Sequence, residues 1–213
     1  NGTTYTFTIT ATYSDGVDSQ PVQANLSGTP TGPPSVPLNV SAQAGNAQAT
    51  ISWQTPDSDG GAAITSYTAT SSTGNLTCST SSNQCTITGL TNGTNYTFTV
   101  TATNSEGDSA SSDASNTITP ITVPDQPINA EATRGDGFVT VSWEAPADNG
   151  GSSISSYTVT ANPSGLTCTT STTSCAVSGL NNGTQYSFTV TASNQAGTGE
   201  ESNSSNIAIP GDA

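Results

Sequence analysis

The chain has 213 residues, of which 31% are hydrophobic, and its 21 glycines and 12 prolines argue against a large helical core. One basic residue, Arg134, stands against fifteen acidic residues, so the formal net charge is −14. Binding to nucleic acid or to an anionic lipid surface requires several cations, and this composition therefore excludes both as partners. No apolar run reaches the roughly 18 residues that span a bilayer, which excludes direct membrane insertion.

Equivalent residues recur along the chain at a spacing of 90. Trp53 is repeated as Trp143, and the same spacing joins Tyr67 to Tyr157, Leu90 to Leu180 and Tyr96 to Tyr186. Residues 1–10 match residues 92–101, so the chain begins inside a repeat. We therefore expect a partial repeat at 1–30, complete repeats at 31–120 and 121–210, and the start of a linker or tail at 211–213.

Within a repeat, the hydrophobic pattern has a period of two. Strands are expected from Ala47 to Trp53, from Ile64 to Thr70, from Gln84 to Thr88 and over residues 96–102, where apolar residues alternate with threonines. Turn-rich segments separate these runs, for example at residues 56–61 and 91–94. About seven short strands and no helical stretch in 90 residues predict an all-β, Greek-key sandwich.

The four cysteines form two identically spaced pairs, Cys78 with Cys85 and Cys168 with Cys175. A zinc site would require Cys-x-x-Cys pairs or histidines, and the chain has neither. Two local disulfides are the better interpretation. They predict a secreted protein, located outside the cell or on its surface.

The residues from Trp53 through Pro56, Asp57, Gly60-Gly61, Ile64 and Tyr67 resemble the fibronectin type III domains of bacterial surface and secreted proteins. The resemblance continues through Gly89-Leu90 and Asn92-Gly93-Thr94 into Tyr96-Thr97-Phe98-Thr99-Val100-Thr101-Ala102, and residues 121–210 repeat it. It implies tandem immunoglobulin-like β-sandwiches. Proline-rich connections at 30–37 and 120–127 predict that these sandwiches form a rod-like array.

The resemblance also assigns positions to individual residues. It places Trp53 and Trp143 on strand B, Tyr67 and Tyr157 on strand C, and Tyr96 and Tyr186 at the tyrosine corner of strand F. Together with Leu90 and Leu180, these are the expected hallmark residues of the core. The cysteine pairs are not a general feature of the family, and by register they would link strand C′ to strand E.

Two motifs offer candidate sites, each with a plainer alternative. Four acidic residues are expected at one end of the first complete repeat and could hold Ca²⁺ between domains: Asp57, Asp59, Glu106 and Asp108. The alternative is that they belong to turns rich in Asp and Gly. Arg134-Gly135-Asp136 matches an integrin-type adhesion tripeptide, but it falls in the turn between strands A and B, where Gly-Asp-Gly suits a tight hairpin.

No catalytic residues and no required cofactor are predicted. The chain has no His and no Lys, so neither a Ser-His nor a Cys-His pair can form. We therefore expect a non-catalytic segment of an extracellular multidomain protein, acting as a stalk, a spacer or a fibre-forming unit. The alternatives are an adhesion or ligand-binding module for protein or glycan, and an accessory spacer of a secreted polysaccharide hydrolase.

The expected partners are other domains of the same long chain and, in a fibre, identical chains. Residues 1–30 supply only the last two strands of a sandwich, and these two strands cannot form a core alone. We expect either that the parent chain continues upstream or that another subunit completes this sandwich.

Overall fold

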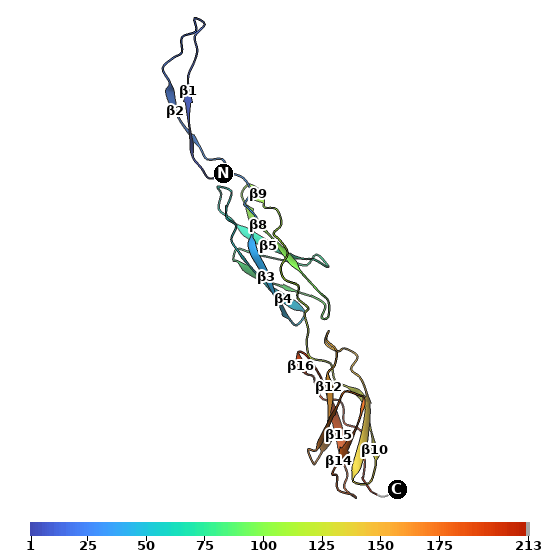
Figure 1. Ribbon diagram of the computed structural model, residues 1–213. Coiled ribbons are helices and arrows are strands. Elements are labelled where there is room, and N and C mark those ends of the chain that lie inside the picture. Colours follow the sequence, from blue (N-terminus) through green and yellow to red (C-terminus); the bar gives the residue numbers. More distant parts are fainter. Residues whose placement is uncertain (212–213) are drawn as a thin grey trace. The chain divides into compact units, whose positions relative to one another are not determined.

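A computed structural model describes residues 1–211, without the side chains of residues 22–27 (Figure 1). The predicted tail at 211–213 thus lies outside the described residues after Gly211. The described residues fold into a hairpin followed by two β-sandwiches. They include no helix that is long and apolar enough to cross a membrane.

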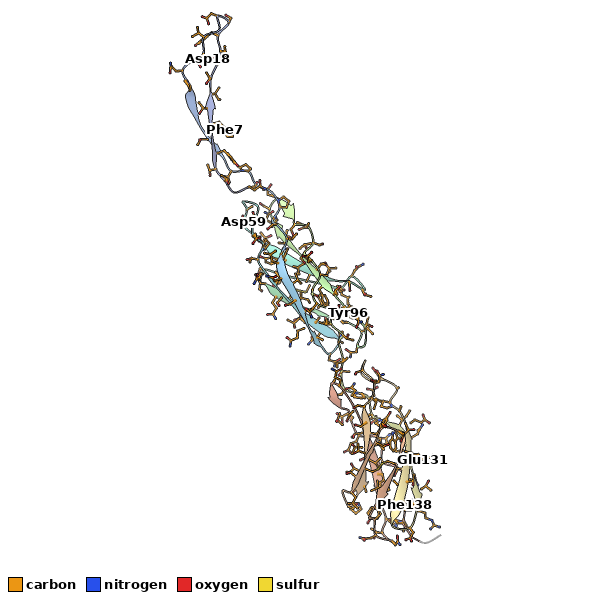
Figure 2. The ribbon with its side chains drawn as sticks, in the orientation of Figure 1. Phe7, Asp18, Asp59, Tyr96, Glu131 and Phe138 are labelled. Atoms are coloured by element: carbon orange, nitrogen blue, oxygen red, sulfur yellow. A yellow bond between two sulfur atoms is a disulfide. The ribbon has the colours of Figure 1, made fainter. Side chains whose placement is uncertain are left out.

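The hairpin pairs β1 (Tyr5–Ile9) with β2 (Val22–Gly28) in antiparallel register. Phe7, at the centre of β1, is 55% exposed (Figure 2), whereas its equivalent in the first complete repeat, Phe98, is 1% exposed. The hairpin therefore presents an apolar strand face that a complete repeat buries.

The first sandwich spans the repeat predicted at 31–120 and consists of two sheets. The three-stranded sheet has the order β3-β4-β7, and the four-stranded sheet has the order β6-β5-β8-β9. The strand bounds are β3 (Leu38–Gly45), β4 (Gln48–Gln54), β5 (Ser66–Ser71), β6 (Thr77–Thr80), β7 (Gln84–Thr88), β8 (Phe98–Asn104) and β9 (Gly107–Asp108).

The second sandwich has the same topology. Its sheets have the orders β10-β11-β14 and β13-β12-β15-β16. The strand bounds are β10 (Ile128–Arg134), β11 (Phe138–Glu144), β12 (Ser156–Asn162), β13 (Thr167–Thr170), β14 (Ser174–Ser178), β15 (Ser187–Asn194) and β16 (Gly197–Thr198). The predicted fold class, tandem all-β sandwiches, is confirmed.

The core of each sandwich is built by the period-two pattern. On β8, Phe98, Val100 and Ala102 are buried, while the threonines between them are only partly buried. On β4 the same alternation buries Ile51 and Trp53. The inner faces of the two sheets thus share one apolar layer, as expected for strands with one solvated face.

The last segment of each sandwich is not a regular strand. Residues 109–117 form no regular ladder, and a single bridge follows at Ile118, opposite Tyr96. Every third residue of this segment is a serine whose hydroxyl oxygen accepts a backbone N–H of β8. These serines are Ser109, Ser112 and Ser115. The reason is that serine hydroxyls, rather than a continuous backbone ladder, satisfy the β8 amides.

Candidate functional site

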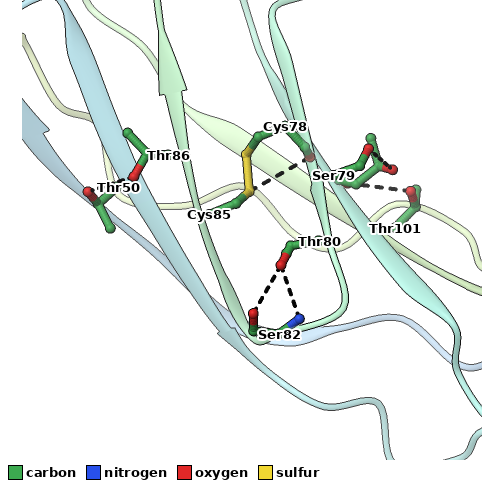
Figure 3. The surroundings of a disulfide bond; sticks show 9 residues. Thr50, Cys78, Ser79, Thr80, Ser82, Cys85, Thr86 and Thr101 are labelled. Atoms are coloured by element: carbon green, nitrogen blue, oxygen red, sulfur yellow. Dashed lines mark hydrogen bonds between the residues drawn. A yellow bond between two sulfur atoms is a disulfide. The ribbon is translucent and has the colours of Figure 1, made fainter.

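A disulfide closes one side of each sandwich. Cys78 lies on β6, an edge strand of the four-stranded sheet, and Cys85 lies on β7, an edge strand of the three-stranded sheet. The structure joins them with a Cα–Cα distance of 6.2 Å (Figure 3). Cys168 and Cys175 link β13 to β14 in the same way. Each bond therefore connects the two sheets of one sandwich at their edges.

An asparagine closes the opposite side. The edge strand there is β3, and the N–H of Ala42 donates to Oδ1 of Asn116 at 2.9 Å, while Nδ2 of Asn116 donates to the Ala42 carbonyl at 3.0 Å. In the second sandwich Asn206 and Ala132 form the same pair of bonds, at 2.8 and 2.9 Å. An exposed edge strand offers such groups to other chains, and here the amide side chain occupies those of one residue in the middle of the strand, Ala42.

A buried asparagine ties the end of β8 to neighbouring loops. Nδ2 of Asn104 donates to the carbonyl oxygens of Gly32 and Asp59 at 2.8 and 2.7 Å, and its Oδ1 accepts the Glu106 N–H at 2.8 Å. Asn194 makes equivalent bonds in the second sandwich. A buried amide that satisfies three backbone groups fixes the loops around it.

The hallmark residues of the sequence analysis lie in the two cores. The rings of Trp53 and Tyr67 have centroids 5.4 Å apart, and those of Trp143 and Tyr157 have the same separation. Leu90, Leu180, Tyr96 and Tyr186 are buried as well. Burial raises the pKa of Tyr67 and of Tyr157 above 10.0, because desolvation disfavours the phenolate.

One hydrogen bond of the tyrosine corner is resolved in the second sandwich. The Tyr186 hydroxyl accepts the Asn181 N–H at 3.2 Å. The indole Nε1 atoms of Trp53 and Trp143 are buried and have no hydrogen-bond partner among the described residues. The aromatic residues thus contribute mainly by packing.

The carboxylates proposed for calcium act separately, as hydrogen-bond acceptors in turns. Oδ1 of Asp59 (Figure 2) accepts the Gly61 N–H at 2.8 Å, and Oδ1 of Asp108 accepts the Thr103 hydroxyl at 2.6 Å. Across residues 1–211, no three acidic, histidine or cysteine side chains form a group that could hold a metal ion. The structure therefore does not bring together the predicted set Asp57, Asp59, Glu106 and Asp108 as a calcium site.

The adhesion-like tripeptide lies on the hairpin turn between β10 and β11. The Gly135 N–H donates a hydrogen bond to the Phe138 carbonyl at 2.9 Å. Oδ1 of Asp136 accepts a hydrogen bond from Nδ2 of Asn182 at 2.7 Å. Gly137 has a φ of 70°, a conformation that glycine adopts without strain. A Cβ on Gly135 would lie 2.3 Å from the Phe138 ring. Local backbone geometry thus accounts for Gly137, whereas a side chain at Gly135 would require only that the exposed Phe138 ring move aside.

The second sandwich has a surface groove of about 570 Å³. It is lined by Thr122, Val123, Pro124, Asp125, Gln126, Ile128, Ala147 and Glu200. Two carboxylates, a hydroxyl and an amide are present, but the chain contains no histidine or lysine that could activate a nucleophile. The groove therefore provides no nucleophile–base pair of that kind.

The asparagines and serines described above were not singled out in the sequence analysis. The signal that could have found them is the 90-residue spacing, which relates Asn104 to Asn194, Asn116 to Asn206, Ser112 to Ser202 and Ser115 to Ser205. Polar residues are abundant in this chain, so their recurrence at one spacing is more informative than their identity.

Comparison with known proteins identifies the repeats. The family model described as "Fibronectin type III domain" matches residues 32–118 and 124–208. The chain is 34% identical to chitinase A1 of Niallia circulans over 175 residues, which are 77% of this chain and 24% of that protein. It is 35% identical to endoglucanase B of Cellulomonas fimi over 125 residues, 53% of this chain and 12% of that protein.

A relative from a different setting also matches. The chain is 34% identical to human myomesin-2 over 140 residues, which cover 58% of this chain and 9% of that protein. The chain thus spans no more than about a quarter of the curated relatives named here. The two matched regions cover most of the chain and coincide with the two sandwiches, and the chain belongs to the fibronectin type III family.

Proposed function

We propose that this chain is a non-catalytic spacer segment of an extracellular multidomain protein. The observation that carries the proposal is the closure of both open sides of each sandwich, by a disulfide on one side and by an asparagine on the other. A module closed in this way stays folded without lateral partners. Its contribution is then the distance it places between its neighbours along the chain.

The disulfides support the extracellular part of the proposal. Both cysteine pairs are bonded and no cysteine of the described residues is free. Structural disulfides persist in oxidising compartments and are rare in the cytosol. The similarity to chitinase A1 and endoglucanase B agrees with this location.

Small-angle X-ray scattering tests the spacer role. A strand-based domain of this size is about 35 Å long, given about 3.3 Å per residue and loops at both ends. Deleting residues 121–210, which form a sandwich with a core of its own, should shorten the largest particle dimension by about that length. An unchanged dimension would contradict a spacer, since repeats that fold back on one another add no reach.

A second candidate role is that of an accessory spacer in a secreted polysaccharide hydrolase. The similarity to chitinase A1 and endoglucanase B favours it. In the parent protein, removal of residues 31–210 should lower hydrolysis of an insoluble polysaccharide and leave hydrolysis of a soluble oligosaccharide unchanged. A parent protein that hydrolyses neither substrate would exclude this role and leave the general spacer role intact.

A further inference from the structure

A groove near the end of β10 is lined by an unusual combination of residues. Its lining consists of Ala132, Arg134, Ile207, Ala208 and Ile209, and we call it the Arg134 groove; its volume is about 310 Å³. Ala208 is buried and bridges Tyr186, which leaves its neighbours Ile207 and Ile209 facing outward, at 62% and 41% exposure. Two branched apolar side chains therefore flank the only cation of the chain.

The first sandwich provides an internal comparison for this groove. At the equivalent positions, 90 residues earlier, it has Ala44 for Arg134, Thr117 for Ile207 and Thr119 for Ile209. It also has the larger Ile118 where the second sandwich has Ala208. The two sandwiches share their topology, so the fold itself does not require the arginine or the two exposed isoleucines. This combination of lining residues occurs in the second repeat and not in the first.

The charge of the chain indicates what can dock there. Arg134 is exposed, and within residues 1–211 no carboxylate forms an ion pair with it. With fifteen acidic residues and one basic residue, any contact between two copies that pairs side chains of opposite charge must use Arg134. Elsewhere, two copies present carboxylates to each other and repel.

The same turn also supplies a partner for the arginine. Asp136 lies two residues after Arg134, is exposed, and has only its Oδ1 in a hydrogen bond, with Asn182. A two-fold contact requires a patch that is complementary to itself. A patch with a guanidinium, a carboxylate and apolar side chains meets that condition, because each charge of one copy can face the opposite charge of the other.

We propose that the Arg134 groove is a self-association surface, where a second copy of this chain docks and Arg134 of each copy pairs with Asp136 of the other. The exposed isoleucines of the two copies pack together and exclude water from the charge pairs. The contact consists of two charge pairs and four isoleucines, far fewer groups than the roughly 20–30 residues a side of a standard stable interface, so the dimer is weak, with a Kd on the order of 0.1 to 1 mM. This inference goes beyond the spacer role, which requires no self-association.

Sedimentation equilibrium of the whole chain, up to about 1 mM, tests the proposal. The unsubstituted 213-residue chain should dimerise. The variant Arg134→Ala/Ile207→Thr/Ile209→Thr, which carries the residues of the first repeat, should dimerise at least about tenfold more weakly. Leu166→Thr, which changes an apolar side chain of the same sandwich with 40% exposure, is the matched control and should associate like the parent.

A charge exchange identifies the pair itself. Arg134→Asp and Asp136→Arg should each weaken the dimer, and the double variant Arg134→Asp/Asp136→Arg should restore it, because both reciprocal pairs are then reformed. Circular dichroism and tryptophan fluorescence verify that every variant is folded.

Three results would overturn the proposal. They are a parent chain that stays monomeric at 1 mM, a triple variant that associates as strongly as the parent, and single charge variants that the double variant does not rescue. Association through the exposed face of the β1–β2 hairpin would give the second result, since groove substitutions leave that face unchanged.

Discussion

Ser112 and Val100 are joined by two hydrogen bonds of different kinds. The N–H of Ser112 donates to the Val100 carbonyl at 3.0 Å, and the Ser112 hydroxyl oxygen accepts the Val100 N–H at 2.9 Å. Ser202 and Val190 make the same two bonds in the second sandwich. One serine thus satisfies both backbone groups of a buried strand residue, and its own segment need not be a strand.

This relationship predicts a large effect for a small substitution. Ser112→Ala removes the acceptor of the Val100 N–H, which is buried, and an unsatisfied buried donor costs about 1–3 kcal/mol. We expect that loss of unfolding free energy in the first sandwich, measured by urea denaturation. Faster hydrogen exchange at the Val100 amide should accompany it. Ser111→Ala, one residue earlier and exposed, is the control, and an equal effect of both substitutions would refute the serine's role.

The asparagine at the edge of β3 leads to a second prediction. Asn116→Ala removes both bonds to Ala42 and should cost about 1–3 kcal/mol of unfolding free energy, because each such hydrogen bond contributes about 0.5–1.5 kcal/mol. Hydrogen exchange at the Ala42 amide should speed up. Asn116→Asp keeps an acceptor for that amide but loses the donor, so it should retain the protection of Ala42 better than the alanine variant. Unchanged exchange in Asn116→Ala would show that the edge is protected in another way.

Each disulfide should stabilise its own sandwich. The bond closes a loop of about eight residues, for which the chain-entropy relation gives about 2.5 kcal/mol. The double substitution of Cys78 and Cys85 by Ser should lower the thermal midpoint of the first sandwich by roughly 10–20 °C, and the second sandwich should be unaffected. Reduction of the parent chain should lower both midpoints. A reduced protein that melts like the oxidised one would mean that the sheets need no covalent link.

The two core tyrosines predict an alkaline limit of stability. Burial raises the pKa of Tyr67 and Tyr157 above the ordinary value of 10.0, so at high pH the unfolded state releases its phenolic protons first. Stability is therefore unaffected below about pH 10 and falls as the pH rises through the unfolded pKa toward the folded one.

Urea denaturation between pH 8 and 11 measures this limit. Tyr67→Phe/Tyr157→Phe should flatten the decline, whereas Tyr13→Phe, at an exposed tyrosine, should leave it unchanged. If the unfolding free energy of the double variant falls with pH as steeply as that of the unsubstituted chain, other groups cause the decline.

Much of the fold follows from local pattern in the sequence. The alternation of Phe98, Val100 and Ala102 with threonine defines a strand with one buried face, and the recurrence of Trp53 as Trp143 defines the repeat. The short spacing of Cys78 and Cys85 favours a local disulfide. These features are readable because their signals lie within a few residues or repeat exactly.

The candidate sites were less predictable. The acidic residues Asp59 and Asp108 were candidates for a shared calcium ion, with turns rich in Asp and Gly as the alternative, and in the structure each accepts a local hydrogen bond. For Arg134-Gly135-Asp136, the turn interpretation agrees with the structure. Motif spacing does not reveal which atoms a side chain already contacts, and those contacts decide what it can still bind.

The sequence by itself determined the all-β class, the two complete repeats, the hydrophobic faces of the strands and the disulfide pairs, because each depends either on residues close together in the chain or on recurrence at a fixed spacing. Only the tertiary structure decided how the sandwiches are closed. Asn116 binds Ala42, which lies 74 residues earlier in the chain, and the Arg134 groove is lined both by the end of β10 and by residues 207–209. Such contacts carry no local pattern, since they exist only after the two sheets have packed against each other.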